Sequence, residues 1–461
     1  MGEDKLKGYR GPARKVLEDH ELKVWDDVEL HSGPNVFKGV ILPRSETADD
    51  SHIVLKLYTG YNIGISAEKV TDSKRLGSRE AHYQIPEQEF PFDPEHPNVK
   101  LLGTGGTIAS RLDYKTGAVI PAFSPGELYG AVPELADICN LQTEKLFGIF
   151  SEDMGPKQYI TLAEAIGEEV EKGTAGIVIG HGTDTMHHTA AALSFMCQNL
   201  PIPVVLVGSQ RSSDRPSSDA ALNLIHATRT AAYCDAAEVM VCMFGPTSDR
   251  YGLLHRGTRV RKMHSSYRST FRTIGDIPLA MVDRESFSYL KDDYRRRDPG
   301  RKPLIQPVFD DRVAIVYYYP NMKPDMIDSL VENGYRGIVI AGTGLGHVNK
   351  PLYEPLRRAT EAGVHVYMTV QTLWGYTQMY VYDTGRMLME RGVVPLGNML
   401  PEVAYMKLGW ALAAADDDEG VRELMQRPIA HEITPSEPPD GYIILQGGVP
   451  EVERCMKLIQ K

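Results

Sequence analysis

The sequence predicts an α/β fold in which two parallel-sheet domains form the core and a small N-terminal β-barrel precedes them. From Asn98 onward, continuous apolar runs alternate with helical patterns, as in parallel sheets whose faces are both covered by helices. Before residue 83 the chain instead holds short β-rich runs and no such alternation. A length of 461 residues is about three times that of a typical domain and fits this division.

Residues 1–82 predict a small SH3-like barrel. Three β-rich runs, KVWDDVEL, NVFKGVILP and HIVLKLYTGYNIGIS, are separated by the turn-forming HSGPN and the polar RSETADDS. Residues 83–97 follow as a linker or surface strap. Four prolines in this segment exclude both regular helix and central strand: Pro86, Pro91, Pro94 and Pro97.

Residues 98–300 predict the larger α/β domain. NVKLLGTGG is a strand that ends in a glycine-rich turn, AGIVIG leads directly into HGTDT, and PIPVVLVGSQR is the next strand. The pattern T-x-x-E at Thr161 and Glu164 resembles a capping box, so a helix is expected over 161–172. A second helix is expected over 185–200.

A second linker is expected at residues 295–307, RRRDPGRKPLIQP, and residues 301–427 predict a smaller α/β domain. Its strands are RVAIVYYYP, GIVIAGTG and VHVYMTV, with helices near 324–334 and 352–363. Residues 428–461 form a C-terminal tail with little regular pattern.

Composition excludes several classes of protein. A net charge of −11 argues against a general electrostatic grip on nucleic acid or an anionic membrane. No apolar run is long enough to span a bilayer and the first residues show no signal core, so a cytoplasmic location is expected. Five cysteines without a CxxC spacing indicate neither disulfides nor zinc. His181, His187 and His188 lack metal-ligand partners and are expected to be structural.

Two turns rich in small polar residues, LLGTGGTIAS and IVIGHGTDTMHHT, each follow an apolar strand. Carboxyl ends of parallel strands meet at one sheet edge, where ligands gather, so these hydroxyl-bearing turns favour an acyl-transfer site. A dinucleotide fingerprint fits poorly, since G-x-G-x-x-G needs glycine where Ile108 stands. The chain has no GxSxG, HExxH or Walker lysine motif.

The motifs GTGGTIA and GHGTDTM resemble the two signature stretches of the L-asparaginase family of amidohydrolases. FSEDM between them and VVLVGSQR, SDAALNL and VRKMHSSYRSTF beyond them continue the resemblance, which covers roughly residues 98–415. The barrel, the proline-rich strap and the tail resemble the D subunits of archaeal glutamyl-tRNA(Gln) amidotransferases, which carry an asparaginase-like glutaminase behind such an extension.

The resemblance implies roles for five residues. Thr107 is the nucleophile, Tyr114 hydrogen-bonds it from a loop, and Thr183, Asp184 and Lys262 form a second constellation. Three of them have a plainer interpretation as well: a helix N-cap for Thr107, an exposed loop side chain for Tyr114 and a solvated basic stretch for Lys262. Removal from water favours a neutral Lys262 amine that can accept a proton, whereas Asp184 favours the charged form.

The resemblance also implies a substrate site. Asp184 would bind the α-ammonium group of the amino acid and Ser151 its α-carboxylate, while Glu152 contacts the ammonium group or faces solvent. The turn at Gly182 would present backbone N–H groups to the oxyanion. The segment 373–385 departs from the family where a neighbouring subunit contributes a carboxylate, which leaves a shared site open.

The function implied is hydrolysis of the glutamine or asparagine side-chain amide, with ammonia passed to a synthetase-like partner subunit that converts Glu-tRNA(Gln) to Gln-tRNA(Gln). We expect no metal or cofactor in this chain, ATP and Mg on the partner, tRNA held mainly by the partner, and a homodimer within a heterotetramer. Two alternatives are a free-standing cytoplasmic asparaginase or glutaminase and an amino-acid-binding protein without turnover.

Overall fold

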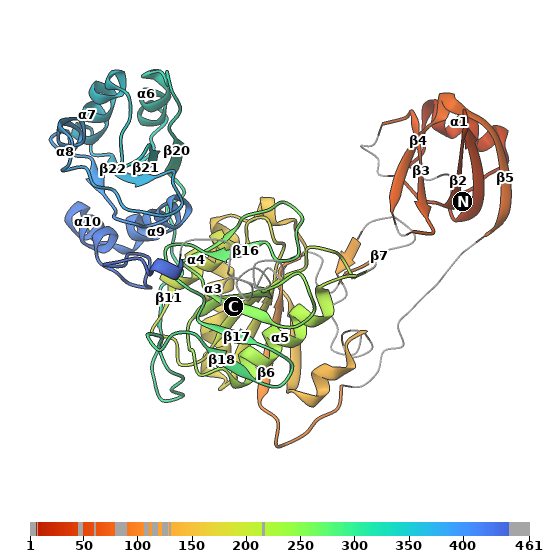
Figure 1. The fold of residues 1–461 in the computed structure, drawn as a ribbon, viewed down its shortest axis with the longest axis horizontal. Coiled ribbons are helices and arrows are strands. Elements are labelled where there is room, and N and C mark those ends of the chain that lie inside the picture. Colours follow the sequence, from red (N-terminus) through yellow and green to blue (C-terminus); the bar gives the residue numbers. More distant parts are fainter. Residues whose placement is uncertain are drawn as a thin grey trace, which may run out of the picture.

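The computed structural model describes residues 6, 8–44, 49–59, 61–78, 90–105, 110–112, 119–121, 128, 131–213 and 217–441. Figure 1 shows the N-terminal strands at one side, the large sheet in the centre and the smaller α/β unit at the other side. The predicted asparaginase-like two-domain α/β core is confirmed, and a small antiparallel sheet stands where the N-terminal β-barrel is predicted.

The N-terminal unit contains helix α1 (Gly11–Asp19) and a five-stranded antiparallel sheet in the order β4-β3-β2-β1-β5. Its strands are β1 (Asp26–Ser32), β2 (Asn35–Ile41), β3 (His52–Leu57), β4 (Asn62–Ser66) and β5 (Val70–Ser78). The sequence patterns do not predict helix α1. Pro12 stands in its first turn, where a missing N–H costs nothing, and Leu17 is fully buried in the unit's core.

The central sheet has eight strands in the order β18-β17-β14-β13-β12-β10-β6-β9. Their bounds are β6 (Asn98–Gly103), β9 (Asn140–Lys145), β10 (Gly176–Gly180), β12 (Val204–Val207), β13 (Val239–Phe244), β14 (Gly252–Arg256), β17 (Ala280–Val282) and β18 (Phe287–Tyr289). The strands from β9 to β13 are parallel, as predicted, and those from β13 to β18 pair antiparallel. The sheet is therefore mixed, because β13 and β14 are joined by a short loop and parallel pairing needs a long crossover.

Helices α3 (Pro156–Glu171), α4 (Met186–Met196) and α5 (Ala220–Tyr233) pack against this sheet. Helix α3 begins at Pro156, so the capping box predicted at Thr161 is wrong and that residue lies inside the helix. The Gln158 side chain instead accepts a hydrogen bond from the Gly155 backbone N–H at 3.1 Å. Helix α4 ends at Met196 and is followed by the short strand β11 (Cys197–Gln198).

The smaller α/β unit has a four-stranded parallel sheet in the order β20-β21-β22-β23. Its strands are β20 (Val313–Tyr317), β21 (Gly337–Gly342), β22 (His365–Val370) and β23 (Val394–Pro395). Its helices are α6 (Asp325–Glu332), α7 (Tyr353–Glu361), α8 (Asp383–Met389), α9 (Pro401–Ala414) and α10 (Asp418–Gln426).

The segment 295–307 connects the two α/β units and is bound along the larger one. Strand β19 (Leu304–Ile305) pairs with β11, and the Arg297 guanidinium donates to the carbonyls of Ala175 at 2.6 Å and Ala231 at 2.9 Å. The tail adds a second connection. Arg259 donates to the His431 carbonyl at 3.0 Å, and the Trp374 indole donates to the Gly441 carbonyl at 2.9 Å.

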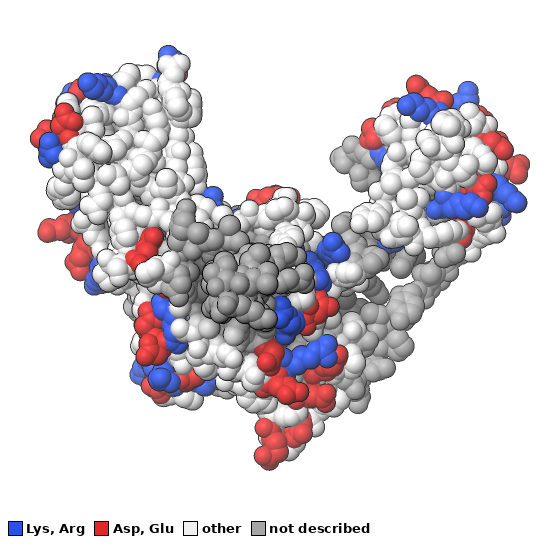
Figure 2. Space-filling view, in the orientation of Figure 1, with Lys and Arg blue, Asp and Glu red and all other residues white. Residues whose placement is uncertain are grey.

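Positive and negative side chains are interspersed on the face shown in Figure 2, which agrees with the modest acidic balance of the sequence. Within the described ranges, no helix combines the length and the apolar composition that crossing a bilayer requires.

Candidate active site

The site lies at the carboxyl ends of the parallel strands β6, β10 and β12. The Thr104 backbone N–H and hydroxyl both donate to the Gly180 carbonyl, at 3.1 and 2.9 Å, which ties the end of β6 to the end of β10. Gly105 follows with a φ of 124°, and a Cβ at this position would lie 2.1 Å from the Ile149 carbonyl oxygen. Glycine is therefore required for the chain to leave β6 in this direction.

A cavity of about 270 Å³ opens at this edge. It is lined by the segment before α3, the turn after β10, the loop after β12 and the chain around Lys262: Phe150, Ser151, Glu152, Gly182, Thr183, Asp184, Ser209, Gln210, Lys262 and Ser265. Six residues predicted from the sequence thus come together: Ser151, Glu152, Gly182, Thr183, Asp184 and Lys262. Thr107 and Tyr114 lie outside the described residues.

Lys262 reaches the cavity from a two-stranded ribbon of β15 (Val260–Lys262) and β16 (Phe271–Thr273), in which it pairs with Phe271. The ribbon accounts for the sequence spacing between these two residues. The Lys262 ammonium donates to Thr183 Oγ1 at 3.0 Å and to Asp184 Oδ1 at 2.7 Å. The Lys262 side chain is 10% exposed and that of Asp184 is 68% exposed, so Asp184 is the member of this cluster that is open to a ligand.

Ser151 and Gly182 are close neighbours in the cavity wall. Ser151 is buried in a short 3₁₀ helix, and the Thr185 hydroxyl donates to its carbonyl. A Cβ at Gly182 would lie 2.8 Å from the Ser151 Cβ and 3.0 Å from its hydroxyl oxygen. Only glycine at position 182 lets this backbone approach Ser151 so closely.

Ser209 and Gln210 are site residues that the sequence does not predict, although they belong to the motif VVLVGSQR. A fully buried carboxylate fixes their loop: Asp219 accepts from the backbone N–H of Gln210 at 3.0 Å and of Arg211 at 2.9 Å. Asn223 donates to the Gly208 carbonyl at 3.0 Å. A polar pair directly after an apolar parallel strand was the available signal for this part of the cavity.

Of the three histidines near the site, His181 and His187 are buried and His188 is partly buried. Burial lowers the pKa of His181 to about 4, and the ring contacts the Gly182 carbonyl oxygen at 2.6 Å and the Thr189 hydroxyl at 2.8 Å. Burial likewise lowers the pKa of His188 to about 4 and that of His187 well below its usual range. In the part of the chain that the structure describes, no group of histidine, cysteine, aspartate and glutamate side chains could hold a metal ion.

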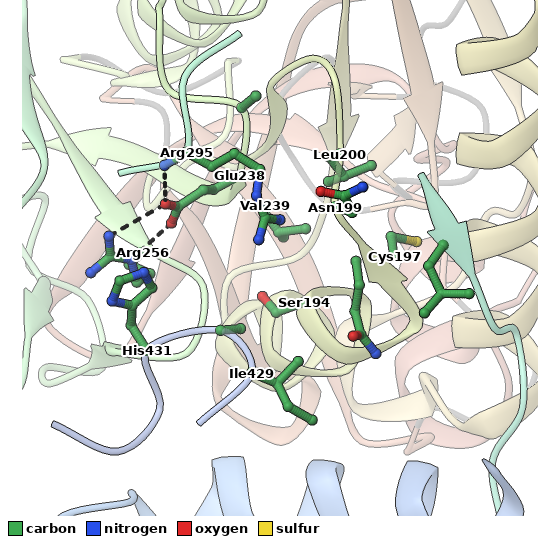
Figure 3. A pocket seen from close by; sticks show the side chains of 14 residues that line it. Ser194, Cys197, Asn199, Leu200, Glu238, Val239, Arg256, Arg295, Ile429 and His431 are labelled. Carbon is green, nitrogen blue, oxygen red and sulfur yellow. Dashed lines mark hydrogen bonds and ion pairs between the residues drawn. The ribbon is translucent and has the colours of Figure 1, made fainter. Parts of the chain in front are cut away.

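A second cavity of about 270 Å³ lies at the amino-terminal end of β13, next to the end of α4 (Figure 3). Its Glu238 carboxylate accepts from Arg256 Nε at 2.8 Å and from the Arg295 backbone N–H at 2.9 Å. Its lining contains no constellation like that of Lys262, Thr183 and Asp184. We therefore assign the candidate active site to the first cavity.

Three family models match the chain. Residues 98–295 match "Asparaginase, N-terminal", residues 312–425 match "Glutaminase/Asparaginase C-terminal domain", and residues 22–73 match "GatD N-terminal domain". Among solved structures, the thermostable L-asparaginase from Thermococcus kodakarensis is 33% identical with a TM-score of 0.65, covering 74% of this chain and 100% of that one. L-asparaginase I from Vibrio cholerae is 27% identical with a TM-score of 0.63, covering 74% and 99%.

The similarity to the D subunits of glutamyl-tRNA(Gln) amidotransferases extends over nearly the whole chain. The D subunit from Pyrococcus furiosus is 49% identical over 439 residues, 93% of this chain and 99% of the relative. The one from Methanopyrus kandleri is 47% identical over 437 residues, 93% and 95%. With its N-terminal unit and both asparaginase-type domains in the same order, the chain belongs to the family of glutamyl-tRNA(Gln) amidotransferase D subunits.

Proposed function

We propose that the chain is the glutaminase subunit of a tRNA-dependent amidotransferase. It hydrolyses the side-chain amide of glutamine or asparagine and supplies the ammonia to a partner subunit that converts Glu-tRNA(Gln) to Gln-tRNA(Gln). The observation that carries this proposal is the Lys262 ammonium bound to both Thr183 and Asp184, in a cavity at the carboxyl edge of the parallel strands.

The reaction needs a nucleophile, a proton acceptor and an oxyanion site. Thr107, two residues after Gly105 in the chain, attacks the amide carbon as its hydroxyl proton passes to a neighbouring base. Backbone N–H groups at the Gly182 turn stabilise the oxyanion. The carbon–nitrogen bond then breaks, and the departing nitrogen takes up a proton and leaves as ammonia. Water then hydrolyses the threonine ester, which releases glutamate when glutamine is the substrate.

The residues of the cavity wall orient the substrate. Asp184, the exposed carboxylate, binds the α-ammonium group, and the Ser151 hydroxyl binds the α-carboxylate. Glu152 lies in the same wall and gives a second negative charge for the ammonium group. Lys262 with Thr183 serves proton transfer, and Tyr114 hydrogen-bonds the nucleophile.

The partner supplies the remaining chemistry. Activation of the glutamyl carboxylate requires ATP and Mg, for which the partner is the proposed site, and the partner also holds most of the tRNA because this chain is acidic. We propose a homodimer of this chain within a heterotetramer. The N-terminal unit, which the asparaginase-type matches leave uncovered, serves the partner.

A second candidate is a free-standing asparaginase, favoured by the match to the whole length of the Thermococcus kodakarensis enzyme. Glutamine turnover by the purified chain, with and without the partner and glutamylated tRNA, separates the two. The amidotransferase subunit should be slow alone and at least ~10-fold faster in the complete system, a coupling of about 1.4 kcal/mol. Fast glutamine turnover that does not change when the partner and tRNA are added would support the free-standing enzyme.

A further inference from the structure

The strand that carries Lys262 is also bound to the smaller α/β unit. Arg261 precedes Lys262 in β15, and both side chains line a shallow cavity with Asp184 and His187. The Arg261 guanidinium is bound on its other side. Its Nη1 donates to Glu402 Oε2 at 3.2 Å, across 141 residues of sequence. Glu402 stands in the first turn of α9, so this ion pair joins the active-site strand to the other unit.

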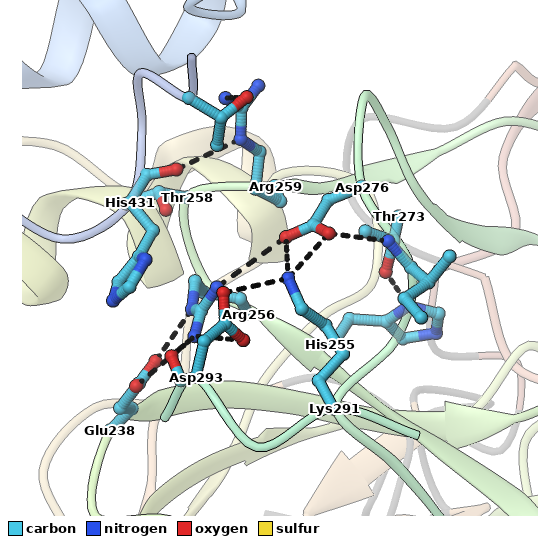
Figure 4. A network of polar contacts seen from close by, with 12 residues as sticks. Glu238, His255, Arg256, Thr258, Arg259, Thr273, Asp276, Lys291, Asp293 and His431 are labelled. Atoms are coloured by element: carbon cyan, nitrogen blue, oxygen red, sulfur yellow. Dashed lines mark hydrogen bonds and ion pairs between the residues drawn. The ribbon is translucent and has the colours of Figure 1, made fainter. Parts of the chain in front are cut away.

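The ribbon of β15 and β16 pairs with no other strand of the described sheets. Val260 and Phe271 anchor it in the core of the larger unit, whereas the end of β15, at Arg261 and Lys262, is only partly buried. Arg259, just before β15, donates from Nη1 to the Asn398 carbonyl and from Nη2 to its side-chain oxygen, both at 2.9 Å. Figure 4 shows Arg259 bound to the tail at His431 and, before it, Arg256 among Glu238, Asp276 and Asp293. Arg261 is the last of these anchors before Lys262.

Glu402 is a buried carboxylate that forms an ion pair with Arg261. The residue is 3% exposed, and its Oε1 accepts no hydrogen bond from the described residues. Burial raises the pKa of Glu402, and Arg261 opposes this effect. The positive end of the α9 dipole also favours the ionised carboxylate. Other titratable groups lie near the pair. Burial and Glu402 raise the pKa of Tyr317 at the end of β20, against the effect of Arg261. Burial and Arg261 lower the pKa of His187 and of His188.

We propose that Glu402 is a positioning residue for Lys262 and acts through Arg261. Through this ion pair, the smaller α/β unit keeps the Lys262 ammonium within hydrogen-bond distance of the Thr183 hydroxyl. This inference rests on the proposed amide hydrolysis for its kinetic consequence. Displacement of a catalytic group by about 1 Å can cost on the order of 100-fold in rate. The α-carboxylate and α-ammonium contacts of the substrate come from Ser151 and Asp184 on other elements, so binding should change less than turnover.

The kinetic test uses the complete amidotransferase complex with glutamine. Glu402→Gln should lower kcat by ~10-fold or more and change KM by less than ~3-fold, and Glu402→Asp should recover part of kcat. The control is Asp310→Asn, because Asp310 is a mostly buried carboxylate of the smaller unit that binds Arg312 at 2.8 Å and Arg336 at 2.9 Å, away from β15. Equal effects of Glu402→Gln and Asp310→Asn on kcat would overturn the proposal.

A second measurement does not depend on activity. Acetylation of Lys262 by acetic anhydride, followed by mass spectrometry, should be at least ~5-fold faster in folded Glu402→Gln than in the wild type, while other lysines react equally. Unchanged labelling together with unchanged kcat would overturn the positioning role. A wild-type complex that hydrolyses neither glutamine nor asparagine would contradict the proposed function instead, and the labelling result would still decide the role of Glu402.

Discussion

The Lys262 ammonium lies 3.0 Å from the Thr183 hydroxyl oxygen although 79 residues separate the two in sequence. Asp184, next to Thr183, accepts from the same ammonium at 2.7 Å. The three side chains come from two elements, the turn before α4 and the ribbon strand β15. They form a connected hydrogen-bonded cluster beside the cavity, and groups connected in this way are expected to act as one unit.

Lys262→Met and Asp184→Asn should each lower kcat/KM for glutamine at least ~10²-fold. This factor corresponds to a loss of several kcal/mol of transition-state stabilisation. Because the two side chains share one hydrogen bond, the double variant should be little worse than either single variant. Steady-state kinetics of the three variants measures this coupling. Losses that simply add would show that Asp184 binds substrate independently of Lys262.

Gly182→Ala should impair the site without unfolding the protein. The added methyl group would lie 2.8 Å from the Ser151 Cβ, so the turn or Ser151 must shift. We expect at least a ~10-fold loss of kcat/KM with an almost unchanged melting temperature. Gly173→Ala is a control for the folded state, since a Cβ there has no neighbour within 4 Å and only its φ of 78° is strained. Wild-type kinetics in Gly182→Ala would show that the close contact is dispensable.

Lowering the pH should destabilise the protein at pH values that are still above the pKa range of its carboxylates. Burial lowers the pKa of four histidines to between about 3 and about 4: His181, His188, His226 and His255. Their folded pKa lies below the unfolded value of 6.5, so their stabilisation is present above pH 6.5 and is lost as the pH falls toward 4.

Urea unfolding at about pH 7.5 and about pH 5 checks this prediction. One such histidine contributes roughly 2 kcal/mol to the difference, because the unfolded chain binds a proton that the folded chain excludes. His181→Gln should reduce the pH dependence, and Gln can still pair with the Gly182 carbonyl. A free energy of unfolding that does not change between these two pH values would be inconsistent with neutral buried histidines.

Lys407 and Glu432 form an ion pair in which both side chains are fully buried, joining α9 to the tail. Lys407→Met leaves the carboxylate without its cation and should cost about 3–5 kcal/mol of stability. Adding Glu432→Gln removes the stranded charge and keeps an acceptor for the backbone N–H groups of Ile429 and Ala430, so the double variant should regain part of the loss. Chemical unfolding measures both, and a double variant worse than Lys407→Met would contradict a charge-based cost.

Much of the site could be predicted because its residues lie in short local patterns. Gly182, Thr183 and Asp184 follow a buried strand directly, and Lys262 stands in a fixed register with Phe271. Arg261 and Glu402 gave no such signal, because an ion pair across 141 residues of sequence depends on how the two α/β units are placed. The sequence pattern predicts that helix α3 begins at Thr161, whereas the helix begins at Pro156. The capping pattern at Thr161 and the proline at position 156 are two competing signals for a helix start.

The contacts of residues 295–307 with the larger unit could not be predicted from the sequence either. Their basic, proline-containing composition indicates a linker, but Arg297 donates to backbone carbonyls of the larger unit, and a sequence pattern cannot show which carbonyls lack partners. The N-terminal sheet could be predicted in outline from alternating short runs, whereas α1 was hidden in a short segment of mixed charge.

The path of the amide nitrogen can be followed in the complete complex. With [amide-¹⁵N]glutamine, ATP and Glu-tRNA(Gln), the wild type should place ¹⁵N in the amide of Gln-tRNA(Gln). Thr107→Ala should lower this transfer by at least ~10³-fold, because the attacking atom is lost. Ammonium chloride should restore Gln-tRNA(Gln) formation in that variant, since the partner is intact. Undiminished ¹⁵N transfer by folded Thr107→Ala, or none by the wild type, would contradict the account.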